Sequence, residues 1–200
     1  RSRDLFSFMI EHFQGVRKGI VNQFLEAAGV DHKTNPKTLR PEEIVQLVRA
    51  TMTFNDFLKP DATCLSPIGK DLFETGIVKE LNLDSNADFI KVVQREPATY
   101  SGFPFIVESA VAYGPSVARQ NKSGITIYRF ANRIPLLYDE ASDVMWKVVN
   151  NNINWSIYNV SSDTPLVVAV HLCSTKIPYK TVGKEYIADQ PEIEREITNA

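Results

Sequence analysis

The sequence has few cysteines, little net charge and no long hydrophobic run, and each absence excludes a class of protein. Its two cysteines, Cys64 and Cys173, are far apart and lack metal-ligand spacing, so we expect reduced thiols in an intracellular protein. No apolar run reaches the ~20 residues of a membrane-spanning helix, and no signal peptide opens the chain. The net charge is −2, so any contact with nucleic acid requires a local basic patch.

Motifs for common catalytic and metal sites are also missing. The three histidines have no ligand spacing, and His171, inside an apolar stretch, is interpreted as a hydrogen-bonded core residue. The chain has neither a nucleophile elbow nor a P-loop. We therefore expect no catalytic residue and no metal ligand within this segment.

The composition is that of a globular protein, with 44% hydrophobic and 23% charged residues. Apolar residues at helical spacing dominate the first third. Helices are predicted there at residues 5–13, at residues 16–28 and at residues 70–76. A further helix is predicted to start near Pro41. Because a helix starts directly after Arg1 and the chain ends within another, we expect a segment of a longer protein.

The pattern changes near residue 88. Strands are predicted at 103–113, 125–132 and 166–174, with a hairpin loop at 114–124 and helices at 139–151 and 191–200. The predicted class is α+β. A small helical domain, residues 1–86, precedes an α/β domain, residues 87–200, with a small mixed sheet, a right-handed crossover and helices on one face.

The last predicted strand leads into a lysine-bearing loop. The apolar run Leu166–Leu172 is followed by Lys176, Lys180 and Lys184, which are spaced around a proline and a glycine. A flexible ammonium group at the end of a strand can reach a phosphate that another part of the protein holds. The loop is therefore the strongest candidate for chemistry in the chain.

Several blocks together resemble one known family, the B subunit of DNA topoisomerase VI. They are residues 104–108 (PFIVE), 128–138 (YRFANRIPLLY), 153–155 (INW) and 174–179 (STKIPY). The N-terminal third resembles that family's helix–two-turns–helix domain, including residues 65–69 (LSPIG), and the remainder resembles its transducer domain.

The resemblance implies a role in a type IIB topoisomerase, whose B subunit is a GHKL ATPase that dimerises on ATP while a separate A subunit cuts DNA. The expected cofactors, ATP and Mg²⁺, belong mainly to an upstream domain. This chain has no GHKL asparagine helix, Asp-x-Gly-x-Gly motif or glycine-rich lid, so it is not expected to hydrolyse ATP alone. The implied partners are DNA, the A subunit and a second B subunit that docks through the absent ATPase domain. No membrane partner is implied. The implied compartment is the cytoplasm or nucleoid of a prokaryote or the nucleus of a eukaryote.

The resemblance also assigns roles to individual residues. It places Lys184 at the γ-phosphate of ATP, with Lys176 as the second choice. Archaeal members carry a Trp-Lys-x-Tyr motif that touches the DNA backbone, where this chain has Trp155, Ser156 and Tyr158 at the corresponding places. The lysine is absent, and the alternative is that Trp155 packs beneath the helix and Tyr158 caps it.

Two further candidates remain. Arg17 and Lys18 open a predicted helix, where backbone amides and basic side chains make a phosphate site; the alternative is an ordinary solvated turn. Asn132 and Arg133 have no derived role, and we expect Arg133 to pair with Glu108 or Asp139 inside the fold.

Two other functions stay open. One is a nucleic-acid-binding or scaffold module that has lost ATP coupling. The other is a transducer of a GHKL chaperone or mismatch-repair protein, which the helical first third disfavours. The glycine–lysine pair at 183–184 favours the ATP-coupled form.

Overall fold

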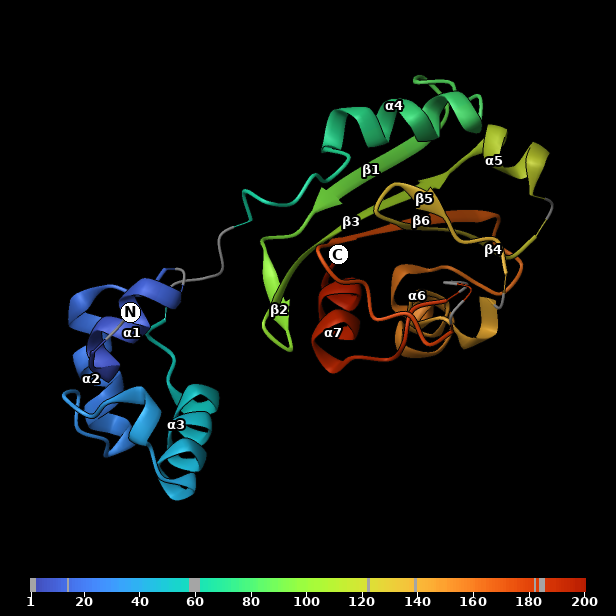
Figure 1. Ribbon diagram of the computed structural model, residues 1–200. Coiled ribbons are helices and arrows are strands. Elements are labelled where there is room, and N and C mark those ends of the chain that lie inside the picture. Colours follow the sequence, from blue (N-terminus) through green and yellow to red (C-terminus); the bar gives the residue numbers. More distant parts are fainter. Residues whose placement is uncertain are drawn as a thin grey trace. The chain divides into compact units, whose positions relative to one another are not determined.

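The computed structural model describes residues 3–13, 15–57, 62–121, 123–138, 140–181, 183 and 186–200 (Figure 1). The chain divides into two compact units, Arg1–Asp61 (unit 1) and Ala62–Ala200 (unit 2). The predicted boundary after residue 86 is therefore too late. The reason is that helix α4 (Lys70–Glu80) packs Phe73 and Ile77 against the sheet of unit 2.

Unit 1 contains the predicted helices that precede α4. Its elements are α1 (Leu5–His12), α2 (Lys18–Ala28), a 3₁₀ turn (Pro36–Thr38) and α3 (Pro41–Thr53). Asp4 caps α1 by accepting the Ser7 N–H at 2.7 Å, and Gly29 ends α2 with a φ of 67° that suits glycine. The helices enclose a small apolar core that consists of Leu5, Met9, Val21, Phe24, Leu25, Ala28 and Val30.

Unit 2 is built on a mixed six-stranded sheet. The strand order is β1-β3-β6-β4-β5, with β2 also paired to β3. The strands are β1 (Phe89–Gln94), β2 (Ala98–Tyr100), β3 (Phe103–Tyr113), β4 (Ile125–Ala131), β5 (Ile134–Pro135) and β6 (Leu166–Ser174). The pair β3–β6 is antiparallel, and β4 runs parallel to β6.

The connections between strands differ in part from the prediction. The parallel pair β4–β6 confirms the expected crossover, whose hand stays a prediction. The hairpin expected at 114–124 is wrong, because β6 lies between β3 and β4 and helix α5 (Pro115–Gln120) occupies that segment.

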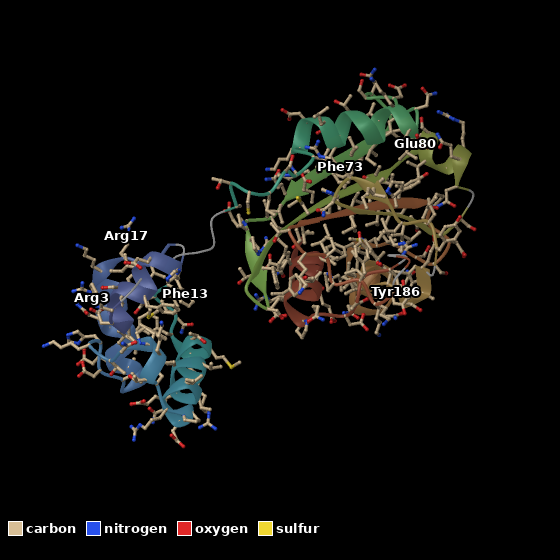
Figure 2. All side chains as sticks on the ribbon, viewed as in Figure 1. Arg3, Phe13, Arg17, Phe73, Glu80 and Tyr186 are labelled. Atoms are coloured by element: carbon tan, nitrogen blue, oxygen red, sulfur yellow. The ribbon has the colours of Figure 1, made fainter. Side chains whose placement is uncertain are left out.

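Helices cover both faces of the sheet, so the prediction of helices on one face is wrong. Helices α4 and α5 pack on one face, and α6 (Val144–Lys147) and α7 (Pro191–Asn199) pack on the other (Figure 1). Figure 2 shows Phe73 on the side of α4 that faces the sheet. All nine residues of β6 are buried, and a strand whose side chains alternate between two faces is fully buried only when both are covered.

The helix predicted at 139–151 is broken into shorter pieces. They are a 3₁₀ turn (Glu140–Ser142), α6 and a π-helical turn (Val148–Asn152), and a further 3₁₀ turn follows (Trp155–Tyr158). Across the described ranges, no helix combines the length and apolar character needed to cross a bilayer.

Candidate functional site

The lysine-bearing loop is closed at its base by backbone pairing. Tyr179 and Ile187 form an antiparallel bridge, and the Ala188 N–H donates to the Pro178 carbonyl at 2.8 Å. In sequence, the bridge encloses residues 180–186. Lys184, the predicted phosphate contact, belongs to this segment and lies outside the described residues. The structure therefore describes how the base of the loop is held.

A buried carboxylate fixes this base to the adjacent helix. Asp143 is 0% exposed, and its Oδ2 accepts the Ile187 N–H at 2.8 Å. Its Oδ1 accepts the Met145 N–H at 2.8 Å, which caps the start of α6. The Val144 N–H in turn donates to the Ile187 carbonyl at 3.2 Å. Both backbone groups of Ile187 are thus tied to α6.

Arg129 of β4 lies against the same carboxylate. Its Nη1 is 3.6 Å from Asp143 Oδ2, and its Nη2 donates to the carbonyls of Leu136 and Tyr138 at 3.1 Å each. Both charged side chains are 0% exposed. Burial raises the pKa of Asp143, an effect opposed by the Ile187 hydrogen bond and the Arg129 charge. This cluster joins the loop, α6 and β4, and sequence reasoning missed both of its charged members.

Lys176 is held differently. Its ammonium lies 4.6 Å from the centroid of the Phe103 ring. Its N–H donates to Ser174 Oγ at 3.2 Å, and its carbonyl accepts the Tyr100 hydroxyl. The Lys176 side chain is exposed, and a contact between a cation and an aromatic ring at an exposed site gains about 0.5–1 kcal/mol. The phosphate contact of Lys176 stays a prediction, and it requires the ammonium to leave this ring.

A second buried network lies on the opposite face of the sheet. The Glu108 carboxylate accepts the N–H groups of Ile68 at 2.8 Å and Gly69 at 2.6 Å, where α4 begins. It also accepts His171 Nδ1–H at 2.6 Å, while His171 Nε2 accepts the Arg133 N–H at 3.0 Å. The Arg133 N–H fixes the tautomer, since Nε2 must be the acceptor.

The Glu108 network stabilises the ionised carboxylate. Glu108 and His171 are both 0% exposed. Burial alone would raise the pKa of Glu108, but the hydrogen bonds from His171, Ile68 and Gly69 outweigh it and hold this pKa below its ordinary value. The interpretation of His171 as a hydrogen-bonded core residue is confirmed.

The turn between β4 and β5 connects two segments that are distant in sequence. Asn132 Nδ2 donates to the Ser174 carbonyl at 3.0 Å, and Asn132 Oδ1 accepts the Ser174 N–H at 2.9 Å. Arg133 Nη2 donates to the Pro67 carbonyl at 2.8 Å and to Ser66 Oγ at 3.1 Å. The predicted pairing of Arg133 with Glu108 is therefore wrong, because the guanidinium reaches the 66–67 loop instead. The alternative partner, Asp139, lies outside the described residues.

The two aromatic candidates for DNA contact differ in exposure. Trp155 Nε1 donates to the Val149 carbonyl at 2.6 Å, and the indole packs against the core of unit 2. Tyr158 is 64% exposed, with its ring centroid 6.4 Å from that of Trp155. Tyr158 is thus the side chain of this pair that can meet a ligand, and a DNA contact by either residue stays a prediction.

The basic candidates in unit 1 lie where α2 begins. The helix starts at Lys18 rather than at the predicted Val16, and Arg17 is the residue before it. Both side chains are exposed, and Figure 2 shows Arg17 extending away from the helices. The first N–H groups of a helix lack partners within that helix. This arrangement is compatible with phosphate binding, which stays a prediction.

Comparison with known proteins gives a consistent result. Residues 60–200 match the family described as "Topoisomerase VI B subunit, transducer". The B subunit of type 2 DNA topoisomerase 6 from Saccharolobus islandicus is 44% identical over 201 residues, which cover 100% of this chain and 37% of that protein. The corresponding protein of Saccharolobus solfataricus is 43% identical with the same coverage. The chain thus spans little more than a third of the length of these relatives.

Among solved structures, the B subunit of DNA gyrase from Myxococcus xanthus aligns with 55% of this chain and 31% of its own length. The sequence identity is 16% and the TM-score is 0.36, which is too low to infer a shared overall fold.

Proposed function

The chain belongs to the topoisomerase VI B-subunit transducer family, and we propose that it couples nucleotide binding elsewhere in the full-length protein to DNA passage by a type IIB topoisomerase. The observation that carries the proposal is the built base of the lysine loop. The segment that contains Lys184 is closed by the Tyr179–Ile187 bridge, and Ile187 is fixed to buried Asp143. This anchored base supports the proposal because it fixes both ends of the segment that contains Lys184.

We propose that this segment contributes one phosphate contact rather than a complete nucleotide site. In the described parts of the chain, no three His, Cys, Asp or Glu side chains are grouped to hold a metal ion. A cavity of about 440 Å³ in unit 1 is lined mainly by apolar side chains such as Phe8, Phe24 and Leu47. We propose that ATP and Mg²⁺ are bound mainly by a domain outside this sequence.

In this proposal, Lys184 contributes a compact positive charge that distinguishes a terminal phosphate from its absence. A ligand shifts a conformational equilibrium only when it binds one state more tightly than the other, and this contact supplies the difference. The Asp143 cluster would transmit the loop position to α6 and β4. Helix α7 follows the loop in sequence and would transmit the change in loop position to the A subunit.

DNA is the second proposed partner, and removing the basic pair at α2 tests it. The double variant Arg17→Gln, Lys18→Gln should bind duplex DNA more weakly and with a shallower salt dependence. Each lost phosphate contact reduces the slope of log K against log salt by about 0.9, so the slope should fall by about 1.8. Fluorescence anisotropy across a salt series measures both quantities.

The matched control removes two exposed lysines from α4, as Lys70→Gln with Lys79→Gln, and changes the net charge equally. Its salt slope should equal that of the wild type. Equal slopes in all three proteins would exclude Arg17 and Lys18 from the DNA interface and leave Tyr158 as the next residue to replace.

An activity measurement distinguishes the proposed ATP-coupled function from the alternative, a scaffold without ATP coupling. The full-length protein with its A partner should hydrolyse ATP faster in the presence of DNA and relax supercoiled DNA. A complex that binds DNA but neither hydrolyses ATP nor relaxes DNA would contradict the proposal and support the scaffold.

A further inference from the structure

Both cysteines of the chain line one cavity in unit 2. The cavity has a volume of about 270 Å³, and its wall includes Cys64, Cys173, Asn132 and Arg133. Cys64 is exposed, Cys173 is 4% exposed, and both are free thiols. Neither thiol has a role in the proposed coupling function, although the fold brings these two residues together from distant positions in the sequence.

The two walls of this cavity are held by consecutive residues of one turn. Arg133 binds Ser66 and Pro67, which follow Cys64 closely in sequence. Asn132 binds both backbone groups of Ser174, the residue after Cys173. The turn is therefore hydrogen-bonded to both cysteine-bearing segments that line the cavity.

We propose that Cys64 and Cys173 are a thiol pair that closes reversibly to a disulfide when a low-molecular-weight disulfide oxidises the protein. The Cys64 thiolate attacks the small disulfide, forms a mixed disulfide and releases one thiolate. The Cys173 thiolate then attacks Cys64 Sγ and releases the second thiolate. The protein loses two protons and two electrons, and the small disulfide becomes two thiols.

The environments of the two thiols set this order. Burial raises the pKa of the Cys173 thiol, and the Ser66 amide and Arg133 charge oppose the rise. Cys173 is therefore slow to react with reagents in solution, whereas Cys64 is accessible to them. Once Cys64 carries the mixed disulfide, Cys173 lines the same cavity, so the second step is intramolecular.

Closure would join the segment where unit 2 begins to the carboxyl end of β6. Cys173 lies three residues before Lys176, at the entry to the lysine loop. The disulfide would fix this end of β6 to the 64–69 segment, which Glu108 already holds at Ile68 and Gly69.

Equilibration of the 200-residue chain with mixtures of oxidised and reduced glutathione tests the pair. After quenching with an alkylating reagent, intact mass should show the loss of two hydrogens, no alkylation and no retained glutathione. Peptide mapping should join the Cys64 peptide to the Cys173 peptide. The measured quantity is the ratio of the oxidised glutathione concentration to the square of the reduced glutathione concentration at which half of the protein is oxidised. This ratio should be at least about tenfold lower for the folded chain than for the chain in guanidinium, because folding raises the effective concentration of one thiol near the other.

Single-cysteine variants provide the controls. Cys173→Ser should stop at the Cys64–glutathione mixed disulfide, and Cys64→Ser should leave Cys173 reduced. Circular dichroism of each protein establishes that it is folded during the reaction. The proposal is overturned if folded wild type stops at a mixed disulfide, forms only intermolecular dimers, or oxidises no more readily than the denatured chain.

Discussion

Replacing Glu108 by alanine should lower the free energy of unfolding by about 3–5 kcal/mol, the cost of breaking a buried charged network by removing one partner. Three donors converge on this carboxylate, namely the amides of Ile68 and Gly69 and His171 Nδ1–H. Alanine leaves all three buried or half-buried without an acceptor, and each unsatisfied group costs about 1–3 kcal/mol. Urea unfolding followed by circular dichroism measures the change.

Two further variants show whether the loss of unfolding free energy comes from removing the acceptor oxygens of Glu108. Glu74→Ala removes the same charge from the exposed surface of α4 and should change stability by less than about 0.5 kcal/mol. Glu108→Gln keeps the shape but offers one acceptor oxygen, so at least one donor meets an NH₂ group. The unfolding free energy lost in Glu108→Gln should fall between the losses in Glu74→Ala and Glu108→Ala. A glutamine variant as stable as the wild type would exclude the network described here.

The same carboxylate predicts how stability depends on pH. The pKa of Glu108 is lowered in the folded chain, so its stabilising contribution is fully present above the unfolded pKa of about 4.3. The contribution is lost as the pH falls through the still lower folded pKa. The stability difference between wild type and Glu108→Gln should therefore be constant from about pH 5 to 7 and shrink below about pH 4.3. A difference that grows on acidification would have the wrong sign.

Replacing Asp143 by alanine should also cost about 3–5 kcal/mol and should release the base of the lysine loop. Arg129 would lose its buried partner, and the N–H groups of Ile187 and Met145 would lose their acceptor. Besides the lower unfolding free energy, amide hydrogen exchange at Ile187 should be faster in conditions where the chain remains folded.

The control for Asp143→Ala is a variant that breaks a surface ion pair of the same helix, α6. Asp189 lies 2.6 Å from Lys147 Nζ, and both side chains are more than a third exposed, so Asp189→Ala should cost no more than about 1 kcal/mol. Equal effects of the two substitutions, or unchanged exchange at Ile187 in Asp143→Ala, would contradict the role assigned to the Asp143 cluster.

Local sequence patterns predicted much of the fold. The helical spacing of unit 1 and the apolar strands β3, β4 and β6 were confirmed. The sequence could have predicted helices on both faces of the sheet, because the nearly continuous apolar run in β6 indicates a strand that is buried on both sides. The domain boundary was missed because the burial of α4 depends on a sheet whose strands come later in the sequence.

The candidate site was less predictable, because its buried charges pair over long separations. Glu108 and His171 are 63 positions apart, and Asp143 and Ile187 are 44 apart. The available signal was a charged residue within an apolar strand, such as Arg129 between Tyr128 and Phe130. That signal indicates that a partner must exist, but the partner is identified only by the strand register and loop closure.

The central claim is that Lys184 senses the terminal phosphate of ATP, and one measurement tests it directly. DNA-stimulated ATP hydrolysis is compared for the full-length protein with its A partner as wild type, Lys184→Ala and Lys180→Ala. We predict at least a tenfold fall for Lys184→Ala, or about 1.4 kcal/mol of lost transition-state stabilisation. Lys180→Ala, an exposed lysine of the same loop, should retain the wild-type rate. Wild-type hydrolysis by folded Lys184→Ala would contradict the claim and make Lys176 the next residue to test.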